Sequence, residues 1–398
     1  MKTKLFLVWA LSLFAACEIV DNDMDRHVKP DVYVSLDEVA GLMAALPMER
    51  VHLCEVHDAV SASSRNGYDE EYTMGNLFTI PGAGVGDEGA LVTRGGKEYG
   101  SPLRGLIRDY LRSIVQTKSV QSIDPESWVD FVAESDMQIY WPYSENWDGE
   151  TYPVVTFDPE DGSEVNIGYK LLIDENGFRQ VEEVVIDEAL AQRQPVWVIN
   201  RNSDSRYMSL EMLRRRDPDW GEGGGSIIVT PGCATRASSS GRSLILKSLT
   251  AGSHHDSWFA GAAEYILRLG ALENFTASTE AELRLYNPLV TEFMVKVKRS
   301  QLKIPQELNV LLVSDWTDQM ETCAFMITED DGGTIKEWEC TALVRVASRS
   351  YGIELKLPFY SYDDIIWRGS IAKKWLDGNE EKIGHFGDVD LTFEVQEY

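Results

Sequence analysis

The sequence predicts an α+β protein that is predominantly β, built from antiparallel sheets with a β-sandwich at its C-terminal end. From about residue 127 onward, short runs with apolar alternation are separated by Gly, Asn and Asp, a pattern typical of strands joined by turns. Apolar residues at helical spacing are prominent only in the N-terminal part of the chain. A Gly- and Ser-rich stretch at residues 220–241 separates two strand-rich regions.

Residues 31–120 are predicted to form a mixed region of helices and loops. One helix should follow the capping residue Ser35 and end before Pro47, because apolar residues recur between them every three or four positions. A second helix is expected from about Pro102 to Val115 on the same grounds. Residues 61–100 are rich in Gly, Ser and Asp, which indicates long loops.

Residues 121–219 are predicted to be a β-rich domain. Turn signals such as Asn176-Gly177 separate short strand-like runs, so an antiparallel sheet is expected, with a sandwich as one arrangement of it. The runs are Met137–Trp141, Tyr152–Phe157, Val165–Ile173, Gln180–Ile186 and Val196–Asn200.

The linker at residues 220–241 leads into residues 242–398, which are predicted to form one β-sandwich. About eight strand-like runs follow one another there, a number that suits a sandwich of ordinary size. They are Leu244–Leu249, Ala262–Leu269, Glu292–Val297, Leu308–Val313, Cys323–Thr328, Cys340–Val346, Gly352–Leu357 and Val389–Val395.

The first residues indicate export. Lys2 and Lys4 precede the uncharged run Leu5–Phe14, which is too short to cross a bilayer as a helix and fits the apolar part of a signal peptide at residues 1–16. The run Phe14–Cys17 resembles the bacterial lipobox, which implies a lipid on Cys17 followed by a flexible tether at residues 17–30. The alternative is an ordinary cleaved signal.

Two segments resemble Bacteroidota surface lipoproteins. The acidic stretch Glu18–Asp25 is similar to their surface-export signal, which implies the cell envelope and the outward-facing leaflet of the outer membrane; a solvated acidic tether is the alternative. The aromatic run Gln138–Trp147 resembles a segment of uncharacterised members of that group. Its aromatic side chains could form a platform for a glycan, although such side chains more often fill a core.

The charge balance limits the partners. A formal charge of −28 argues against nucleic acid and against anionic lipid bound through a basic patch, since both need clustered Lys and Arg. The expected partners are therefore a membrane, through the lipid anchor, and a glycan or a protein. No later window is apolar enough to predict a transmembrane helix.

The cysteines suggest one disulfide. An exported protein lies where disulfides persist, and the chain has 5 cysteines. A hairpin turning at Asp330–Gly333 would place Cys323 directly opposite Cys340, at a distance that a disulfide spans. Two buried free thiols or a slipped register are the alternatives.

Residues 242–398 resemble a C2-type β-sandwich through the segments Asp256–Gly261 and Ser361–Gly369. In that family, aspartates in loops at one end of the sandwich bind calcium. The resemblance implies a calcium site that includes Asp256, Asp363 and Asp364, and Asp315 from another loop could add a ligand. The alternative is a set of solvated loop acids on a sandwich that holds no metal.

Four histidines are the remaining candidates for metal ligands or catalytic bases. His52 with His57, and His254 with His255, are candidate metal ligands or bases, although neither pair has the spacing of a zinc-binding helix. The sequence contains no His-Glu-x-x-His, Gly-x-Ser-x-Gly or Walker motif. The leading hypothesis is therefore a non-enzymatic protein that binds a ligand or partner, and the alternative is a metal-dependent hydrolase of peptides or glycans.

Overall fold

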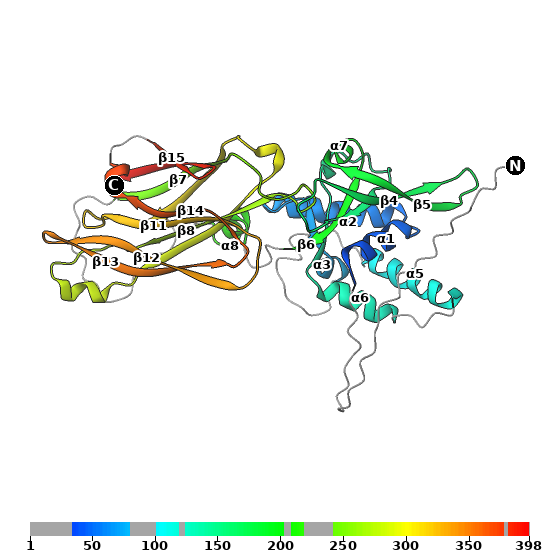
Figure 1. The fold of residues 1–398 in the computed structure, drawn as a ribbon, viewed down its shortest axis with the longest axis horizontal. Coiled ribbons are helices and arrows are strands. Elements are labelled where there is room, and N and C mark those ends of the chain that lie inside the picture. The colour runs from blue at the N-terminus through cyan, green and yellow to red at the C-terminus, as the bar shows by residue number, and fades with distance from the viewer. Residues whose placement is uncertain are drawn as a thin grey trace, which may run out of the picture. The chain divides into compact units, whose positions relative to one another are not determined.

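The computed structural model describes residues 34–79, 101–118, 124–202, 208–218, 242–377 and 381–397 (Figure 1). The chain divides into two compact units. The first consists of the described residues up to Ala62 together with Glu70–Arg201, and the second of Ser63–Asp69 together with the described residues from Asn202 onward. Strands outnumber helices, and most strand pairs are antiparallel, so the predicted fold class is confirmed.

The first unit begins with helices that the sequence marks clearly. Ser35 caps α1 (Leu36–Ala45): its hydroxyl accepts a hydrogen bond from the N–H of Glu38, and the Glu38 carboxylate accepts one from the N–H of Ser35. The other described helices of this part of the chain are α2 (Arg50–Arg65), α3 (Met74–Phe78), α5 (Pro102–Lys118), α6 (Pro125–Glu134) and α7 (Glu188–Ala191). The end of α2 and all of α3 lie within residues 61–100, where long loops were expected, so that expectation is wrong for these residues.

These helices accompany one six-stranded sheet, in the order β1-β2-β6-β3-β4-β5. Helix α1 packs on β3, β4 and β6, and the core between helices and sheet is continuous. All five strand-like runs expected in this region are strands, but β3 and β6 pair in parallel. The strands are β1 (Glu71–Thr73), β2 (Met137–Tyr140), β3 (Val154–Phe157), β4 (Val165–Ile173), β5 (Arg179–Asp187) and β6 (Val196–Arg201).

The boundary expected at residue 120 is not a domain boundary. Strand β1, from the predicted mixed region, pairs with β2, from the predicted β-rich domain, so both regions contribute to one sheet and one unit. Residues 202–219 were assigned to the β-rich domain, but helix α8 (Leu210–Arg216) belongs to the second unit, where Ser209 bridges to Met294. The expected linker at residues 220–241 lies outside the described residues.

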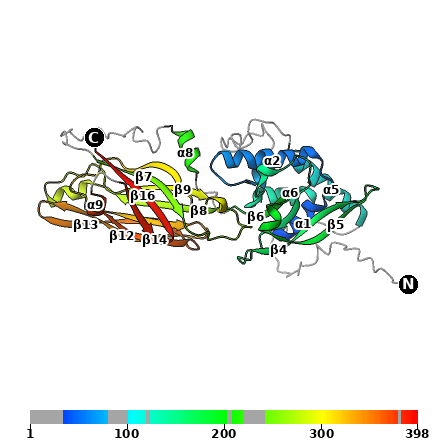
Figure 2. The same ribbon diagram turned by 90° about the horizontal axis from the view of Figure 1, so that it is seen from above.

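The second unit is a sandwich of two four-stranded sheets, which Figures 1 and 2 show from two sides. One sheet has the order β10-β7-β16-β15 and the other β14-β11-β8-β9, with one apolar core between them. Their strands are β7 (Arg242–Ala251), β8 (Ala263–Ala271), β9 (Leu289–Val297), β10 (Gln306–Val313), β11 (Thr322–Glu329), β14 (Asp364–Ala372), β15 (Lys382–Phe386) and β16 (Val389–Glu397).

A hairpin of β12 (Ile335–Val346) and β13 (Arg349–Tyr360) lies on the outer face of the second sheet. A small core joins the two: Ala324 and Met326 of β11 pack with Leu355 and Leu357 of β13. Strand β11 is therefore buried on both faces, since its intervening residues face the main core of the sandwich.

This third layer explains why the expected disulfide is wrong. Cys323 and Cys340 are both free thiols: Cys323 lies opposite Ile371 of β14, and Cys340 lies opposite Leu355 of β13. The Cys323 side chain points into the core between the sheets, whereas the hairpin covers the other face of β11. The Asp330–Gly333 turn signal leads the chain from one layer to the next instead of closing a hairpin of β11 and β12.

Two strands of the sandwich were not expected. Strand β14 covers most of Ser361–Gly369, for which a loop was predicted, and β15 precedes the two-residue turn into β16. The segment that forms β14 begins with acids and contains Gly369, which weakens its strand signal, but it pairs with β11 along its length. Tertiary pairing decides the structure of both strands.

Candidate cation site

Acidic side chains from separate elements meet at one end of the sandwich. Glu329 is the last residue of β11, and it lies opposite Tyr265 of β8 on one side and opposite Asp364, the first residue of β14, on the other. The loop between β7 and β8 brings Asp256 to the same place. We call Asp256, Glu264, Glu329, Asp331, Asp363 and Asp364 the acidic end.

The centre of the acidic end is a compact group of three carboxylates. One carboxylate oxygen from each of Asp256, Glu264 and Glu329 lies within 4.8 Å of the other two. Glu264 and Glu329 are buried, with 5% and 0% exposure. Oxygens that share one calcium ion lie about 2.3–2.6 Å from it, so this spacing suits a common ion.

Glu329 carries the clearest sign of a missing counter-charge. Its Oε1 accepts a hydrogen bond from the N–H of Glu264 at 3.2 Å, whereas its Oε2 is buried and has no donor among the described residues. Burial, and then the neighbouring charge of Asp256, raise the pKa of the Glu329 carboxyl far above its usual value. Two carboxylates this close require a proton or a cation between them.

The surrounding acids extend the negative field. Burial, followed by the charges of Asp256, Asp364 and Asp363, raises the pKa of Asp331 to about 7. Burial also raises the pKa of Asp363, whose Oδ2 accepts a hydrogen bond from the Tyr360 N–H at 2.9 Å. The other carboxylate oxygen, Oδ1, is buried without a donor among the described residues.

Two basic side chains offset part of this charge. Lys296 of β9 lies opposite Glu264, and its Nζ is 2.9 Å from the Glu264 carboxylate, with both side chains buried. Arg268 of β8 is also buried; it pairs with Glu292 and donates to the Thr328 hydroxyl at 2.8 Å. The contact between Asp256 and Glu329 brings two like charges together, and it is where a bound cation would be most favourable.

His254 holds the loop that carries Asp256. Its Nε2 is 3.1 Å from the N–H of Ala263, and its Nδ1 is 3.1 Å from the carbonyl oxygen of Asp256. Nε2 must therefore accept and Nδ1 must donate, which is the neutral tautomer. Arg299 donates to the same carbonyl at 2.6 Å, so the main chain of Asp256 is fixed while its carboxylate faces Glu329.

His255 lies at the edge of the same end. Its Nε2 is 3.1 Å from the carboxylate of Asp388, and its Nδ1 is 3.9 Å from that of Asp364. Both histidines of this pair therefore support loops around the acidic end: His254 binds main-chain groups, and His255 lies between two aspartates.

Asp315 does not belong to the acidic end. It follows β10, and burial and the charge of Glu273 raise its pKa. Glu264 is near the start of β8, whereas Glu273 comes just after its end. A strand of nine residues spans about 30 Å, so Asp315 lies at the opposite end of the sandwich. The expectation that it shares a site with Asp256, Asp363 and Asp364 is wrong.

His52 and His57 are both on α2 in the first unit. Nδ1 of His52 accepts a hydrogen bond from the Glu49 N–H at 2.9 Å and so caps the start of the helix. The ring of His57 lies 5.0 Å from the Trp147 ring and 5.5 Å from the Trp141 ring, and its Nε2 is 3.2 Å from the Ser144 carbonyl oxygen. The two histidines have separate structural roles and do not converge.

In the aromatic run Gln138–Trp147, for which core filling was favoured over a glycan platform, Trp141 fills the core. Trp141 is 1% exposed, packs against Trp197 and is part of the core of the first unit. Tyr143 instead donates to the Glu188 carboxylate at 2.8 Å. Trp141 is therefore a core residue, as was favoured from the sequence.

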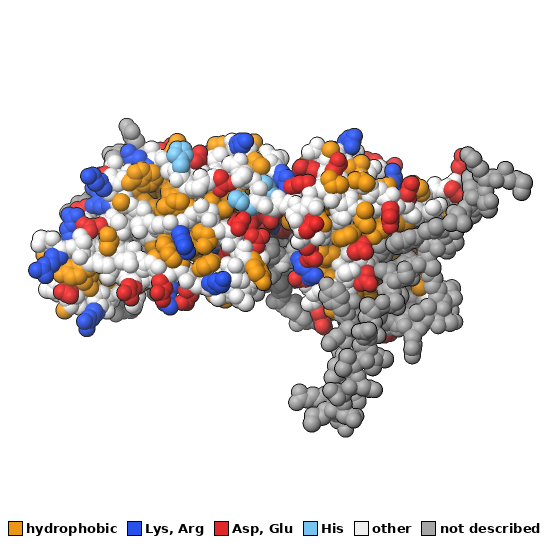
Figure 3. Space-filling view, viewed as in Figure 1, with side chains coloured by type: hydrophobic (Ala, Val, Ile, Leu, Met, Phe, Trp, Pro, Cys, Tyr) orange, Lys and Arg blue, Asp and Glu red, His pale blue; other side chains and the backbone are white. Residues whose placement is uncertain are grey.

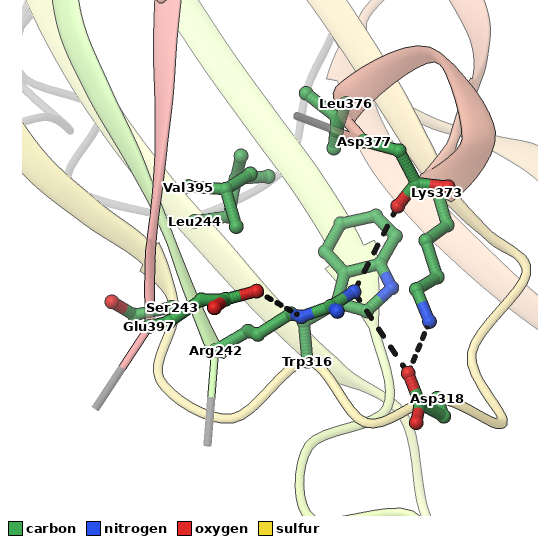
Figure 4. A pocket seen from close by; sticks show the side chains of 10 residues that line it. All are labelled: Arg242, Ser243, Leu244, Trp316, Asp318, Lys373, Leu376, Asp377, Val395 and Glu397. Atoms are coloured by element: carbon green, nitrogen blue, oxygen red, sulfur yellow. Dashed lines mark hydrogen bonds and ion pairs between the residues drawn. The ribbon is translucent and has the colours of Figure 1, made fainter. Parts of the chain in front are cut away.

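A pocket of about 300 Å³ opens at the end of the sandwich opposite the acidic end (Figure 4). Arg242 is 3.1 Å from Glu397 and 3.8 Å from both Asp318 and Asp377, and Lys373 is 2.5 Å from Asp318. Two basic side chains face three acidic ones in the pocket, so its charge does not favour an anion.

Cys17, the signal peptide and the tether lie outside the described residues, as does Cys233. None of the helices described is both long enough and apolar enough to cross a membrane.

Comparison with known proteins identifies no family. No family model matches the sequence, and no curated protein matches it. One solved structure similar to part of the chain is described as "Structure of Drosophila C2-DSL-EGF1"; it is 10% identical, with a TM-score of 0.15, over 40% of this chain and 67% of that chain. A likeness this weak carries no argument about function, and the sheet-rich sandwich itself rests on the strand pairing above.

Proposed function

We propose that this chain is an exported, lipid-anchored bacterial cell-envelope protein that binds a ligand or partner without catalysing a reaction, and that its C2-like sandwich binds a divalent cation at the acidic end. One observation carries the cation site: the Glu329 carboxylate lies beside that of Asp256, and its Oε2 is buried without a donor among the described residues. A cation there would replace the proton that Glu329 must otherwise hold.

Calcium is the cation that fits the ligand chemistry. The acidic end offers carboxylate oxygens, which hard cations prefer, and its three central residues include no thiolate or imidazole. Calcium takes about 6–8 oxygens, so carbonyl groups and water would complete the set. The partly buried carboxylates of Asp331 and Asp363 lie close enough to respond electrostatically to the same charge.

The envelope location rests on the sequence of the leader. The charged start, the short apolar run and the lipobox-like Phe14–Cys17 support a lipid on Cys17, and the acidic Glu18–Asp25 supports export to the cell surface. Mass spectrometry of the native protein should find a mature chain that begins at a lipid-modified Cys17. An intact Met1 or an unmodified Cys17 would overturn the anchor.

Calcium binding is tested by calorimetric titration of the detergent-solubilised full chain. We expect measurable binding and a rise in melting temperature for the native protein, and loss of both in Glu329→Gln. Asp315→Asn is the matched control, because it removes a partly buried carboxylate from the opposite end of the same sandwich. A native protein that shows neither heat of binding nor a thermal shift with calcium would refute the site.

A further inference from the structure

Strand β5 forms an open edge of the first unit's sheet. It pairs with β4 from Arg179 to Asp187, and it is the last strand in the sheet order, so no other described strand pairs with it. An edge strand presents N–H and C=O groups that another strand can bind. Figure 1 shows β4 and β5 as a long hairpin.

The edge lacks some of the features that usually prevent pairing, although four of its nine residues are charged. It is nine residues long and contains no proline, glycine or lysine. Apolar side chains are exposed along it: Val185 is 71% exposed, Phe178, just before the strand, 67%, and Val181 36%. In Figure 3, hydrophobic and acidic side chains are both visible at the surface of this unit.

Glu182 and Glu183 are the only charges that would resist a second identical strand in the middle of β5. Whether they resist depends on the register. If two copies pair antiparallel about Glu183, the two Glu183 carboxylates face each other, which is unfavourable. If they pair about Val181, Arg179 of each copy lies opposite Glu183 of the other, and Gln180 lies opposite Glu182.

The register about Val181 is therefore self-complementary. Arg179, Val181 and Glu183 point to the same face of the strand, so the two ion pairs flank a central contact between the two Val181 side chains. Phe178 of each copy lies opposite Val184 of the other, which covers the exposed aromatic ring. A two-fold axis through Val181 repeats each of these contacts, as a closed dimer requires.

We propose that β5 is a homodimer interface, in which two copies of this chain pair antiparallel about Val181 and their six-stranded sheets become one continuous sheet. The occupant of the edge is a second copy because the charge pattern of the strand matches its own reverse. This interface is independent of the acidic end, which belongs to the other unit.

A charge exchange tests the pairing in the full, detergent-solubilised chain. Analytical ultracentrifugation should give twice the monomer mass for the native protein. Arg179→Glu and Glu183→Arg should each give monomers, because like charges then face each other, and the double variant should restore the dimer. A native monomer at every concentration overturns the proposal, as does a dimer that both single variants leave intact.

Cysteine cross-linking tests the register. Facing residues of antiparallel strands have Cα atoms about 4.5–5.5 Å apart, which a disulfide spans. Val181→Cys should therefore give a disulfide-linked dimer on mild oxidation, with the oxidised native protein as the baseline. Val185→Cys, more exposed on the same face, should not, because the two copies of residue 185 are eight positions apart in this register. Cross-linking of Val185→Cys, or of neither variant, contradicts the register.

Discussion

The carboxylate of Glu329 lies within 4.8 Å of the carboxylate of Asp256, although the two residues are 73 positions apart in the chain. Glu329 is completely buried, and its Oε2 atom has no donor among the described residues. A group in this position binds a proton more tightly in the folded state than in the unfolded state. Its protonation is therefore coupled to folding.

The first prediction concerns pH. Because the pKa of Glu329 is raised on folding, the folded state holds a proton that the unfolded state releases above about pH 4.5. In calcium-free buffer this coupling lowers the free energy of unfolding by up to about 1.4 kcal/mol per pH unit as the pH rises from about 5 to 8. In Glu329→Gln the amide holds no titratable proton, so this contribution should vanish.

Urea unfolding at several pH values measures the difference between the native protein and Glu329→Gln. The difference removes the contributions of other carboxylates, some of which have the opposite sign. Calcium should flatten the native profile, because a bound cation replaces the proton. Identical pH dependences for the two proteins in calcium-free buffer would show that Glu329 is ionised in the folded state.

The second prediction concerns His254. Burial, and then the charge of Arg299, lower its pKa below 6.5. A depressed pKa in the folded state contributes stability that is present above the unfolded pKa and is lost as the pH falls through the folded pKa. We expect His254→Leu to lack this loss below pH 6.5, and to be less stable by about 1–2 kcal/mol at pH 7 because the Ala263 N–H loses its acceptor.

Nitrogen-15 NMR of the histidine rings tests the cause directly, because it distinguishes the tautomers. The hydrogen bonds of His254 require a proton on Nδ1 and none on Nε2 at pH 7. His385→Gln is the control: its side chain is 78% exposed, so its substitution should change stability by less than about 0.5 kcal/mol. A protonated Nε2 on His254 at pH 7 would contradict the assignment.

The third prediction concerns the thiols. Burial raises the pKa of Cys323 to about 12 and that of Cys340 to about 11, so neither forms a reactive thiolate at neutral pH. In the native protein Cys323 should resist alkylation and Cys340, which is less buried, should react slowly. Both should be alkylated after unfolding without a reductant, as mass spectrometry of their peptides would show. A requirement for reductant would restore the disulfide that the strand pairing contradicts.

Cysteine 323 also shows what the sequence could and could not predict. Its run, Cys323–Thr328, is correctly predicted as a strand, because local apolar composition identifies buried strands. The predicted pairing of Cys323 with Cys340 is wrong. The Asp330–Gly333 signal indicates that the chain turns, but it does not indicate which layer the chain enters next. Register and layer depend on contacts distant in sequence.

The residues of the acidic end were predicted only in part, because their meeting also depends on contacts distant in sequence. Asp256, Asp363 and Asp364 lie in loops or at a strand end and could be proposed from a resemblance, and the structure brings them to one end of the sandwich. Glu264 lies inside an apolar strand run and Glu329 directly after one, and both were passed over. The available signal was a carboxylate within a run otherwise buried, which is rare unless the charge is paired.

The last prediction concerns Gly387, in the turn between β15 and β16. Its φ of 65° is a left-handed conformation, and a Cβ added there would lie 2.6 Å from the carbonyl oxygen of Ile366. Gly387→Ala should therefore cost more than the roughly 1–2 kcal/mol that the conformation alone imposes on an L-residue. Gly332→Ala is the control, since its φ of 72° is similar but a Cβ there meets nothing within 4 Å. Calorimetry in calcium-free buffer should show a larger fall in melting temperature for Gly387→Ala; equal falls would mean that the turn moves away from Ile366.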